Sequence, residues 1–331
     1  MTAGFFVGII QVLELGRPRT LFFLGGRKMN ITFITPCAGN GTRMLPWALM
    51  PKEMLPVKSQ DGRIVPILLD LIMKAQDAGI DDFRIVYSEN KKMIREYFTQ
   101  DNSALTSSLY EKGKNEIAKS IKNIPRFSDD NFVIQQGPYG NASPLLSLFF
   151  EMKNENGKWK IVRDLESGDK NFIPSENWIM YMFPDDLYLT VIRNEIQQVI
   201  DAHKKLGGSI LPSKRAEDQS ERDKYAFSDG EVVKGSRGEI IEVSKIVEKP
   251  GNLPIDSDLA NVKGYLIHPD FRKFLRKSFE AFDQDSGEEF MIQNIIQDMI
   301  DAGYKFYAVK IEGEYHDTGN PQDYEDYWKS V

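Results

Sequence analysis

The sequence predicts an α/β protein with a Rossmann-like, mostly parallel twisted sheet, helices on both faces and a small β-ribbon part. Strands and helices alternate through the first half of the chain, which implies parallel strands joined by helical crossovers. The strand predicted at 31–35 leads directly into a glycine-rich loop. Hydrophobic residues make up 41% of the 331 residues, so the chain can bury a sheet of this kind on both faces.

The first elements follow from the spacing of apolar residues. Residues 31–35 form a β-branched and aromatic run that is typical of a buried strand. Between 67 and 78, apolar residues recur at helical spacing and the pattern stops at Gly79. Further strands are predicted at 83–87 and 132–134. Further helical segments are predicted at 91–98 and 103–124, and another helix is predicted to end at 149.

The second half begins with a polar stretch. Residues 151–176 are rich in Gly, Asn and Lys and predict an insertion with a small hairpin around 159–162. A buried strand is expected at 178–182, and residues 224–250 have the pattern of a β-ribbon with a turn at 228–230. The remaining predictions are strands at 210–211, within 261–269 and at 305–310, and helices at 194–206, 270–274, 288–300 and 322–329.

Charge and cysteine content limit the partners. The formal net charge of -7 argues against a general surface for nucleic acid or anionic membrane, so a phosphate site must be a local basic focus. The single cysteine, Cys37, cannot form an intrachain disulfide, which favours a reducing compartment and predicts the cytoplasm. Cys37 itself is expected to be a small buried apolar residue.

Residues 1–28 are predicted to be an N-terminal extension to a domain spanning 29–331. The apolar run at 5–10 is too short to span a bilayer and lacks the basic residues that begin a secretory signal. Met29 directly precedes the first strand. The extension is therefore either loosely attached or the product of a translation start assigned too early.

The predicted site is organised around residues 36–56, PCAGNGTRMLPWALMPKEMLP. Glycines after a strand let backbone amides approach an anion. Arg43 adds a planar fork, and Lys52 adds a compact charge for a second phosphoryl group. The Gly-Asn-Gly run alone also fits an ordinary turn, and neither the P-loop nor the dinucleotide fingerprint is present. The candidate phosphate-binding residues are Ala38, Gly39, Gly41, Thr42, Arg43 and Lys52.

Two later segments offer further polar groups. Gln135 and Gly140 lie in a second glycine loop, where amides at a helix start and a Gln side chain suit a pyrimidine base, although a simple capped turn explains them equally well. Asp185 and Asp186 follow the strand at 178–182. Such carboxylates suit Mg²⁺ bound to phosphate, but they are also common in turns and helix caps.

These motifs resemble the sugar-phosphate nucleotidyltransferases, most closely the bacterial UTP:glucose-1-phosphate uridylyltransferases. The likeness includes Gly-x-Gly-Thr-Arg and Pro-Lys-Glu-Met-Leu-Pro, then Phe-Pro-Asp at 183–185, Val-Glu-Lys-Pro at 247–250 and His-Asp-Thr-Gly at 316–319. It implies a fold of the nucleotide-diphospho-sugar transferase type. Residues 29–212 would mainly bind the nucleotide and 213–331 the sugar.

The resemblance also implies a reaction and roles for residues. A nucleoside triphosphate, with UTP favoured, would react with a sugar 1-phosphate, above all glucose 1-phosphate, to give UDP-glucose and pyrophosphate. Arg43, Lys52 and Lys249 would be the catalytic cations, and Asp185 and Asp317 would bind Mg²⁺. The remaining implied contacts are Asp186 behind the metal site, Gln135 and Gly140 at the base, and Glu248 and Gly264 at the sugar.

Three departures from the family pattern leave the substrate open. Ser143 stands where a His is common, residues 47–50 lack the usual Thr-Lys, and residues 290–294 keep little of the family's sequence. The alternatives are a cytidylyl- or thymidylyltransferase for another sugar 1-phosphate, a non-catalytic nucleotide-sugar-binding relative and, least favoured, a dehydrogenase. The resemblance implies self-association, and neither nucleic acid nor membrane is an expected partner.

Overall fold

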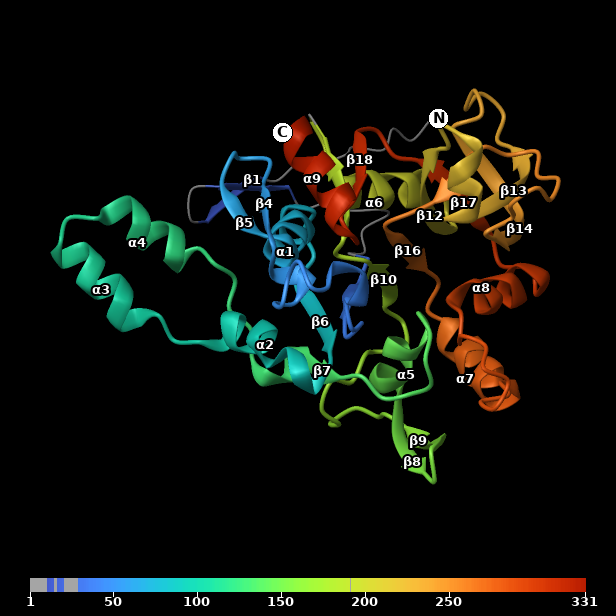
Figure 1. The fold of residues 1–331 in the computed structure, drawn as a ribbon, viewed down its shortest axis with the longest axis horizontal. Helices are drawn as coiled ribbons and strands as arrows, with labels where there is room; N and C mark the ends of the chain where they lie inside the picture. Colours follow the sequence, from blue (N-terminus) through green and yellow to red (C-terminus); the bar gives the residue numbers. More distant parts are fainter. Residues whose placement is uncertain (1–10, 15–16, 21–28, 191) are drawn as a thin grey trace, which may run out of the picture.

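The computed structural model describes residues 11–14, 17–20, 29–190 and 192–331 (Figure 1). None of the helices within these residues is long and apolar enough to cross a membrane. The strands β1 (Gln11–Glu14) and β2 (Arg17–Thr20) pair antiparallel. The rest of the predicted extension, including the apolar run at 5–10, lies outside the described residues.

A ten-stranded sheet with the order β15-β13-β14-β17-β12-β16-β10-β3-β6-β7 forms the centre of the described fold. At one end, β10, β3, β6 and β7 pair in parallel. This block has the Rossmann-like character that the sequence predicts, and its strands match the expected positions. Their bounds are β3 (Ile31–Cys37), β6 (Asp82–Tyr87), β7 (Phe132–Ile134) and β10 (Trp178–Met182).

The other part of the sheet is mainly antiparallel, so the prediction of a mostly parallel sheet is wrong there. Among its described pairings, only β12 and β17 run parallel. The β-ribbon predicted at 224–250 is the β13–β14 hairpin of this same sheet, and hairpin neighbours are antiparallel by connection. The turn predicted at 228–230 is wrong, because these residues lie within the strand β13, where the register only shifts between Asp229 and Gly230. A further pairing of β12 with β15 closes β12, β15, β13, β14 and β17 into a barrel-like ring. The bounds are β12 (Ser209–Arg215), β13 (Ala226–Val232), β14 (Ile240–Glu248), β15 (Leu259–Asn261), β16 (Gly264–Ile267) and β17 (Phe306–Lys310).

The single strand predicted within 261–269 is divided in two. β15 ends at Asn261 and β16 begins at Gly264. Between them Lys263 has φ 73°, a left-handed conformation that interrupts extended backbone. A lysine seldom adopts this conformation, so the residue type did not indicate the break.

Helices cover both faces of the sheet, as predicted. Phe33 and Ile85 pack in the core of one face, and their neighbours Ile34 and Val86 pack in the core of the other. Successive residues of a strand point to opposite faces, so the two cores follow directly from two-residue periodicity. The helices of the first face are α1 (Ile67–Asp77), α2 (Lys92–Thr99) and α6 (Glu195–Leu206), and those of the second are α5 (Ser143–Phe149), α7 (Phe271–Ala281) and α8 (Ile292–Asp301).

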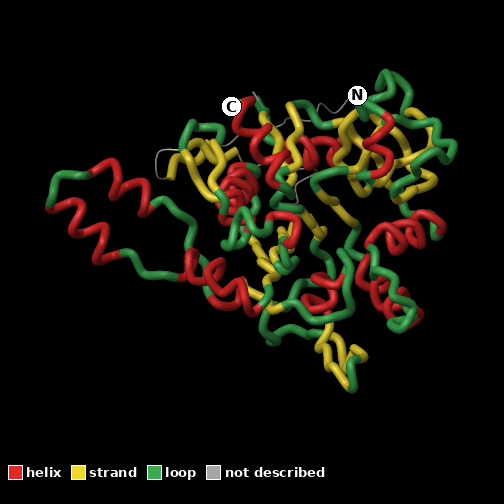
Figure 2. Tube along the Cα trace, in the orientation of Figure 1, coloured by secondary structure: helices red, strands yellow, loops and turns green. Residues whose placement is uncertain are grey.

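Two hairpins project from this body (Figures 1 and 2). The helical segment predicted at 103–124 is two helices, α3 (Ser103–Glu111) and α4 (Asn115–Lys122), because Gly113 adopts φ 70° and ends the first. The strands β8 (Phe150–Glu155) and β9 (Lys158–Asp164) form the hairpin predicted for the 151–176 insertion.

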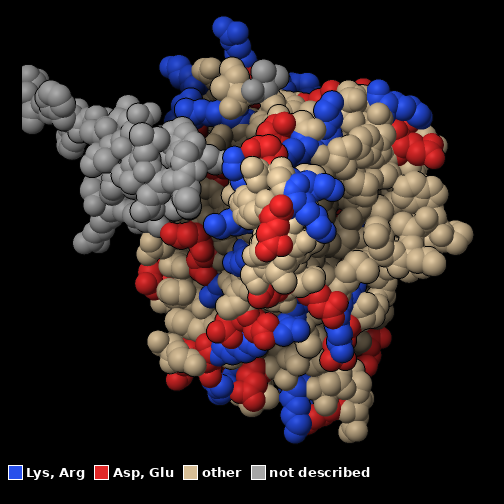
Figure 3. All heavy atoms as spheres, turned by 90° about the vertical axis from the view of Figure 1, so that its left-hand side faces the viewer, with Lys and Arg blue, Asp and Glu red and all other residues tan. Residues whose placement is uncertain are grey.

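The side of the molecule from which the α3–α4 hairpin projects has mixed charge. Figure 3 shows Lys and Arg side chains interspersed with Asp and Glu on this side. On α4, Lys119 pairs with Glu116 at 2.8 Å. Lys112, Lys114, Lys119 and Lys122 are exposed and form a solvated face.

The final helix, α9 (Pro321–Ser330), packs on residues 36–56 and on the hairpin of β4 (Pro56–Lys58) and β5 (Ile64–Pro66). The Tyr324 hydroxyl donates a hydrogen bond to the carbonyl oxygen of Pro56 at 2.6 Å. The backbone N–H of Lys58 donates to the Tyr327 hydroxyl oxygen at 2.8 Å. The end of the chain therefore holds the segment that carries Arg43 and Lys52.

Candidate active site

Three predicted site segments meet at one edge of the sheet. The glycine loop follows β3, Gln135 follows β7 and Asp185 follows β10. These strands belong to the parallel block, so their carboxyl ends lie at the same edge, where open α/β sheets bind ligands.

The side chains of Arg43 and Asp317 both lie close to Gly319. A Cβ atom on Gly319 would lie 2.8 Å from Arg43 Nη2 and 2.9 Å from Asp317 Oδ1. The backbone N–H of Gly319 donates to Asp317 Oδ1 at 2.7 Å, which orients the carboxylate. Gly41 has φ 62° and starts the short 3-10 turn Thr42–Met44 that carries Arg43. The glycine loop and the last predicted motif are thus in contact.

Lys52 forms an ion pair with Asp185, and the two side chains are 14% and 18% exposed. The next residue, Glu53, is buried and accepts hydrogen bonds from Lys91 Nζ at 2.8 and 2.9 Å. Adjacent residues of one motif therefore have separate functions. Glu53 anchors the loop to the protein, and Lys52 faces the predicted metal ligand.

Asp185 and Asp186 lie where the chain enters β11 (Asp186–Leu189). This strand pairs antiparallel with β18 (Glu314–Asp317), and the register places Asp186 opposite Asp317. Thr318 holds Asp185 from the same side, because its backbone N–H and its hydroxyl donate to the Asp185 carbonyl oxygen at 2.9 and 2.7 Å. The two predicted metal ligands are therefore fixed through one two-stranded sheet.

The pKa values of the three aspartates reflect burial and close charges. Burial opposes the ionisation of Asp185, but the charge and hydrogen bond of Lys52 outweigh it and lower the pKa of Asp185. Burial, and then the charge of Asp185, raises the pKa of Asp317. Burial together with Asp185 and Asp317 raises the pKa of Asp186 to about 7. The three carboxylates are close enough to oppose one another's ionisation.

Asp185 and Asp317 fit a divalent cation. Mg²⁺ commonly binds through one or two carboxylates together with phosphate oxygens. The raised pKa of Asp317, caused by burial and then by Asp185, identifies a repulsion that a cation between the two groups would reduce. Within the described ranges, no three Asp, Glu, His or Cys side chains gather into a fuller metal cage. The other ligands would therefore come from phosphate and water.

The second glycine loop is clamped against the residues that precede α8. The backbone N–H of Phe290 donates to the Tyr139 carbonyl oxygen at 2.8 Å, and the N–H of Ala142 donates to the Phe290 carbonyl oxygen at 3.1 Å. Gly140 has φ 147°, and a Cβ atom there would lie 2.2 Å from the Phe290 carbonyl oxygen. Residues 290–294, which depart from the family pattern, thus support the predicted base-binding loop.

Gln135 and Ser143 flank this loop. The backbone N–H of Gln135 donates to the carbonyl oxygen of Tyr87 at 2.8 Å, which continues the pairing of β6 and β7. The Ser143 hydroxyl donates to the carbonyl oxygen of Pro138 inside the loop. Ser143 therefore stabilises the loop conformation at the position where the family commonly has His.

Replacing Gly140 with Ala is expected to destabilise the protein by about 3 kcal/mol or more, because the new Cβ meets backbone atoms that cannot move aside and φ is unfavourable. Thermal unfolding followed by circular dichroism measures this loss. Gly157→Ala is the control, since Gly157 has φ 85° but nothing within 4 Å of a Cβ; it should cost only about 1 kcal/mol. Equal losses of stability in the two variants would contradict the close packing of Gly140 against the Phe290 backbone.

Glu248 and Lys249 lie at the end of β14, beside the aromatic residues of the site. The Lys249 backbone N–H donates to the Tyr225 carbonyl oxygen at 3.2 Å. The Tyr225 and Tyr315 rings are 6.1 Å apart, and the Tyr315 hydroxyl donates to Asp186 Oδ1 at 2.5 Å. The Lys249 side chain is 59% exposed, with its ammonium 4.0 Å from Glu248. Two residues, Tyr225 and Tyr315, therefore link the Lys249 backbone to Asp186.

Gly264 is explained by packing. A Cβ atom there would lie 2.1 Å from the Tyr181 carbonyl oxygen and 2.8 Å from Met182 Cα, and φ is 140°. Glycine is required because β16 and β10 approach closely. Gly264 lets the backbone of β16 pack closely against β10. This packing accounts for the glycine without a contact to a sugar.

Several important residues were not identified from the sequence. Tyr315 lies two residues before Asp317 on β18, so it shares a face with the predicted ligand, and this spacing was the available signal. Lys91 gave no signal because its partner Glu53 is distant in sequence. The expectation that Cys37 is buried is confirmed, and burial raises the pKa of its thiol. The His316 ring packs 5.5 Å from that of Tyr327.

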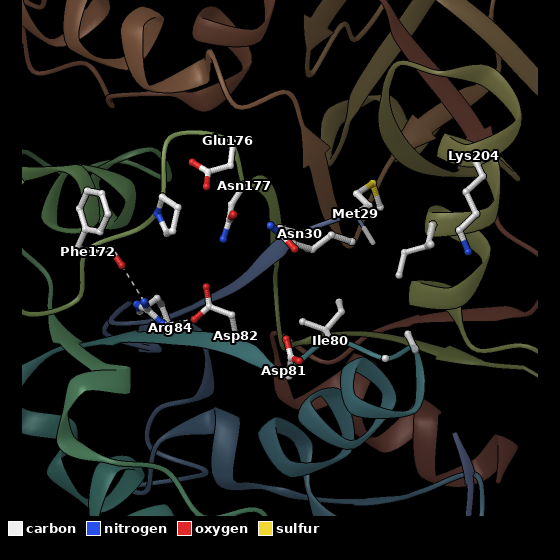
Figure 4. Close-up of a pocket in the computed structure, with 15 residues that line it drawn as sticks. Met29, Asn30, Ile80, Asp81, Asp82, Arg84, Phe172, Glu176, Asn177 and Lys204 are labelled. Atoms are coloured by element: carbon white, nitrogen blue, oxygen red, sulfur yellow. Dashed lines mark hydrogen bonds and ion pairs between the residues drawn. The ribbon is translucent and has the colours of Figure 1, made fainter. Parts of the chain in front are cut away.

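A cavity of about 460 Å³ lies at the opposite edge of the sheet (Figure 4). Asn30, Asp82 and Asn177 line it at the amino ends of β3, β6 and β10. Arg84 spans the cavity wall, with hydrogen bonds to Asp82 and to the Phe172 carbonyl oxygen. None of the predicted site residues lines this cavity. It is therefore separate from the candidate active site.

The fold and the site together define a nucleotidyl transferase. A family model described as a nucleotidyl transferase matches residues 167–331 of the chain. The chain is 27% identical over 290 residues to the UTP–glucose-1-phosphate uridylyltransferase of Bacillus subtilis (strain 168), an alignment that covers 86% of this chain and 85% of that protein.

Solved structures of similar proteins agree in fold. A UDP-glucose pyrophosphorylase complexed with UDP-glucose gives a TM-score of 0.68 at 22% identity, covering 92% of this chain and 100% of that chain. A UTP-bound UGPase from Acinetobacter baumannii gives 0.69 at 21% identity, covering 91% of this chain and 93% of that chain. At these identities the likeness establishes the fold.

Proposed function

We propose that the protein transfers a uridylyl group from UTP to glucose 1-phosphate, forming UDP-glucose and pyrophosphate. The observation that carries this proposal is the contact network of Arg43, Lys52, Asp185 and Asp317 at the carboxyl edge of the sheet. Relatives that align with 86% of this chain are UTP–glucose-1-phosphate uridylyltransferases, which supports the choice of substrates.

In the proposed reaction, an oxygen of the sugar phosphate attacks the α-phosphorus of UTP. The new oxygen–phosphorus bond forms as the bond from the α-phosphorus to the bridging oxygen breaks, and pyrophosphate leaves with the electron pair. No group of the protein needs to be covalently modified. Catalysis therefore depends on positioning and on charge stabilisation.

Asp185 and Asp317 would hold Mg²⁺, which supplies positive charge to phosphate oxygens when bound. Arg43 lies beside Asp317 and Lys52 beside Asp185, so both cations are placed to bind the phosphates of the same nucleotide. Lys52 must exchange its bond with Asp185 for one with phosphate. With a divalent cation held at Asp185, the carboxylate would be neutralised and Lys52 would be free to bind phosphate.

The sugar phosphate is proposed to bind next to the barrel-like ring of β12, β15, β13, β14 and β17. Lys249 has a long exposed side chain at the end of β14 and would contact its phosphate, while Glu248 would accept hydrogen bonds from sugar hydroxyls. In this proposal, residues 29–212 mainly bind the nucleotide and residues 213–331 mainly bind the sugar. Action in the cytoplasm and as a homo-oligomer are further parts of the proposal.

Pyrophosphate release in the presence of Mg²⁺ tests the assignment. We expect release with UTP and glucose 1-phosphate and much slower release when either substrate is exchanged, in a panel of UTP, CTP and dTTP against several sugar 1-phosphates. Faster release with CTP or dTTP would replace the uridylyl assignment with the corresponding alternative. Tight UDP-glucose binding without release in any combination would identify a non-catalytic binding protein.

A further inference from the structure

Lys263 lies in the link between β15 and β16, directly behind Asp186. Its side chain is 1% exposed and its φ is 73°. A lysine in the left-handed region is strained relative to glycine, and a buried ammonium loses its hydration. Both costs persist only where the surrounding contacts compensate for them.

The contacts of Lys263 are concentrated on one segment of the candidate site. Its backbone N–H donates to Asp186 Oδ2 at 2.8 Å, and its Nζ donates to the Asp186 carbonyl oxygen. Its own carbonyl oxygen accepts from the Phe183 N–H at 2.8 Å. Lys263 therefore holds the chain on both sides of Asp185.

A buried charge cluster supports Lys263. Its Nζ lies 3.5 Å from Glu195 Oε1, and Glu195 is fully buried. Lys74 pairs with the same carboxylate at 3.3 Å and with Asp70 at 3.0 Å. Burial opposes the ionisation of Glu195, but Lys74 and Lys263 outweigh it and lower its pKa. Glu195 thus offsets the buried charge of Lys263, which contacts Asp186.

We propose that Lys263 is a positioning residue that fixes the Asp185–Asp186 segment so that the Asp185 carboxylate is oriented toward Asp317. The inference rests on the proposed function, because it assigns the orientation to divalent-cation binding. Lys263 acts through Asp186 and does not itself meet a substrate. Groups behind the ligands of a metal typically change its affinity by about 10- to 100-fold when they are removed.

A purely structural role would make Lys263 equivalent to Lys74. Both lysines are buried and both pair with Glu195. Among the described contacts, Lys74 Nζ bonds the carbonyl oxygen of Tyr188, two residues further along β11, and makes none with Asp185 or Asp186. Lys74→Met is therefore a matched control for Lys263→Met.

The test measures Mn²⁺ binding by electron paramagnetic resonance, with UTP present and no sugar phosphate, so that no turnover occurs. Thermal unfolding is measured on the same samples. We expect both variants to lose stability and only Lys263→Met to bind Mn²⁺ roughly 10- to 100-fold more weakly. Unchanged Mn²⁺ affinity in Lys263→Met, or an equal loss in Lys74→Met, would overturn the positioning role.

Lys263→Gly keeps the test decisive if Lys263→Met fails to fold. Glycine adopts φ 73° without strain and retains the N–H that donates to Asp186 Oδ2. We expect weak Mn²⁺ binding again, because the ammonium is missing, and wild-type affinity would reject the inference. Failure of the proposed function is separate and shows in the wild-type protein, as absent pyrophosphate release with UTP and glucose 1-phosphate.

Discussion

Asp185→Asn should lower the rate of pyrophosphate release by roughly 10³-fold, because the amide removes the negative charge that would hold Mg²⁺ next to the phosphates. The substitution keeps the size of the side chain, and it also leaves Lys52 without its ion-pair partner. A titration of turnover against Mg²⁺ concentration is the measurement. We expect saturating Mg²⁺ to restore little of the lost rate.

Asp82→Asn is a matched control for this prediction. Asp82 also forms a partly buried ion pair, with Arg84, and lies at the amino end of β6 beside the cavity of Figure 4. Loss of this pair should affect stability while turnover per folded molecule stays near that of the wild type. A similar loss of turnover in both variants would show that general damage, rather than a site at the carboxyl edge, explains the effect.

Lys52→Ala has the second largest expected effect, a fall in turnover of roughly 10²- to 10³-fold, because a preorganised charge on the leaving pyrophosphate is lost. The same variant should not weaken metal binding, because Lys52 pairs with the proposed metal ligand Asp185. Lys52 shares Asp185 with any bound cation, so its removal should leave Mn²⁺ binding to the nucleotide-free protein equal or tighter. Turnover should therefore fall while metal affinity stays the same or rises.

Exposed Lys58, in the same segment, provides the control for Lys52. Lys58→Ala should keep wild-type turnover and metal affinity, since its backbone N–H, not its side chain, bonds Tyr327. If Lys52→Ala weakens Mn²⁺ binding together with turnover, loop disruption replaces phosphate binding as the explanation. Near-normal turnover in Lys52→Ala would remove the loop from the proposed site.

The parallel block could be predicted because its information is local. The strand at β7 has the predicted bounds, and the alternation of Phe33 and Ile34 between two cores follows from periodicity. The antiparallel part depends on pairings such as β12 with β15 and β13 with β15. Several arrangements satisfy the same hydrophobic pattern, so strand direction could not be decided from it.

The site shows the same division between local and distant information. Arg43, Lys52 and Asp185 lie in sequence motifs, and the structure brings them together with Asp317. Lys91, which anchors Glu53, comes from a distant segment without a motif of its own. Thr318, which holds Asp185, lies in the motif at 316–319, but its pairing with Asp185 is not visible in the sequence. The position of Lys263 needed its backbone angle, which residue type does not reveal.

The contact between α9 and residues 36–56 bears on how the protein is made. Tyr324 and Pro56, which share a hydrogen bond, are separated by 268 positions in sequence. During synthesis the loop with Lys52 emerges from the ribosome long before Tyr324, so the incomplete chain lacks this support. We therefore expect that the nascent polypeptide gains its binding capacity only after α9 has emerged from the ribosome.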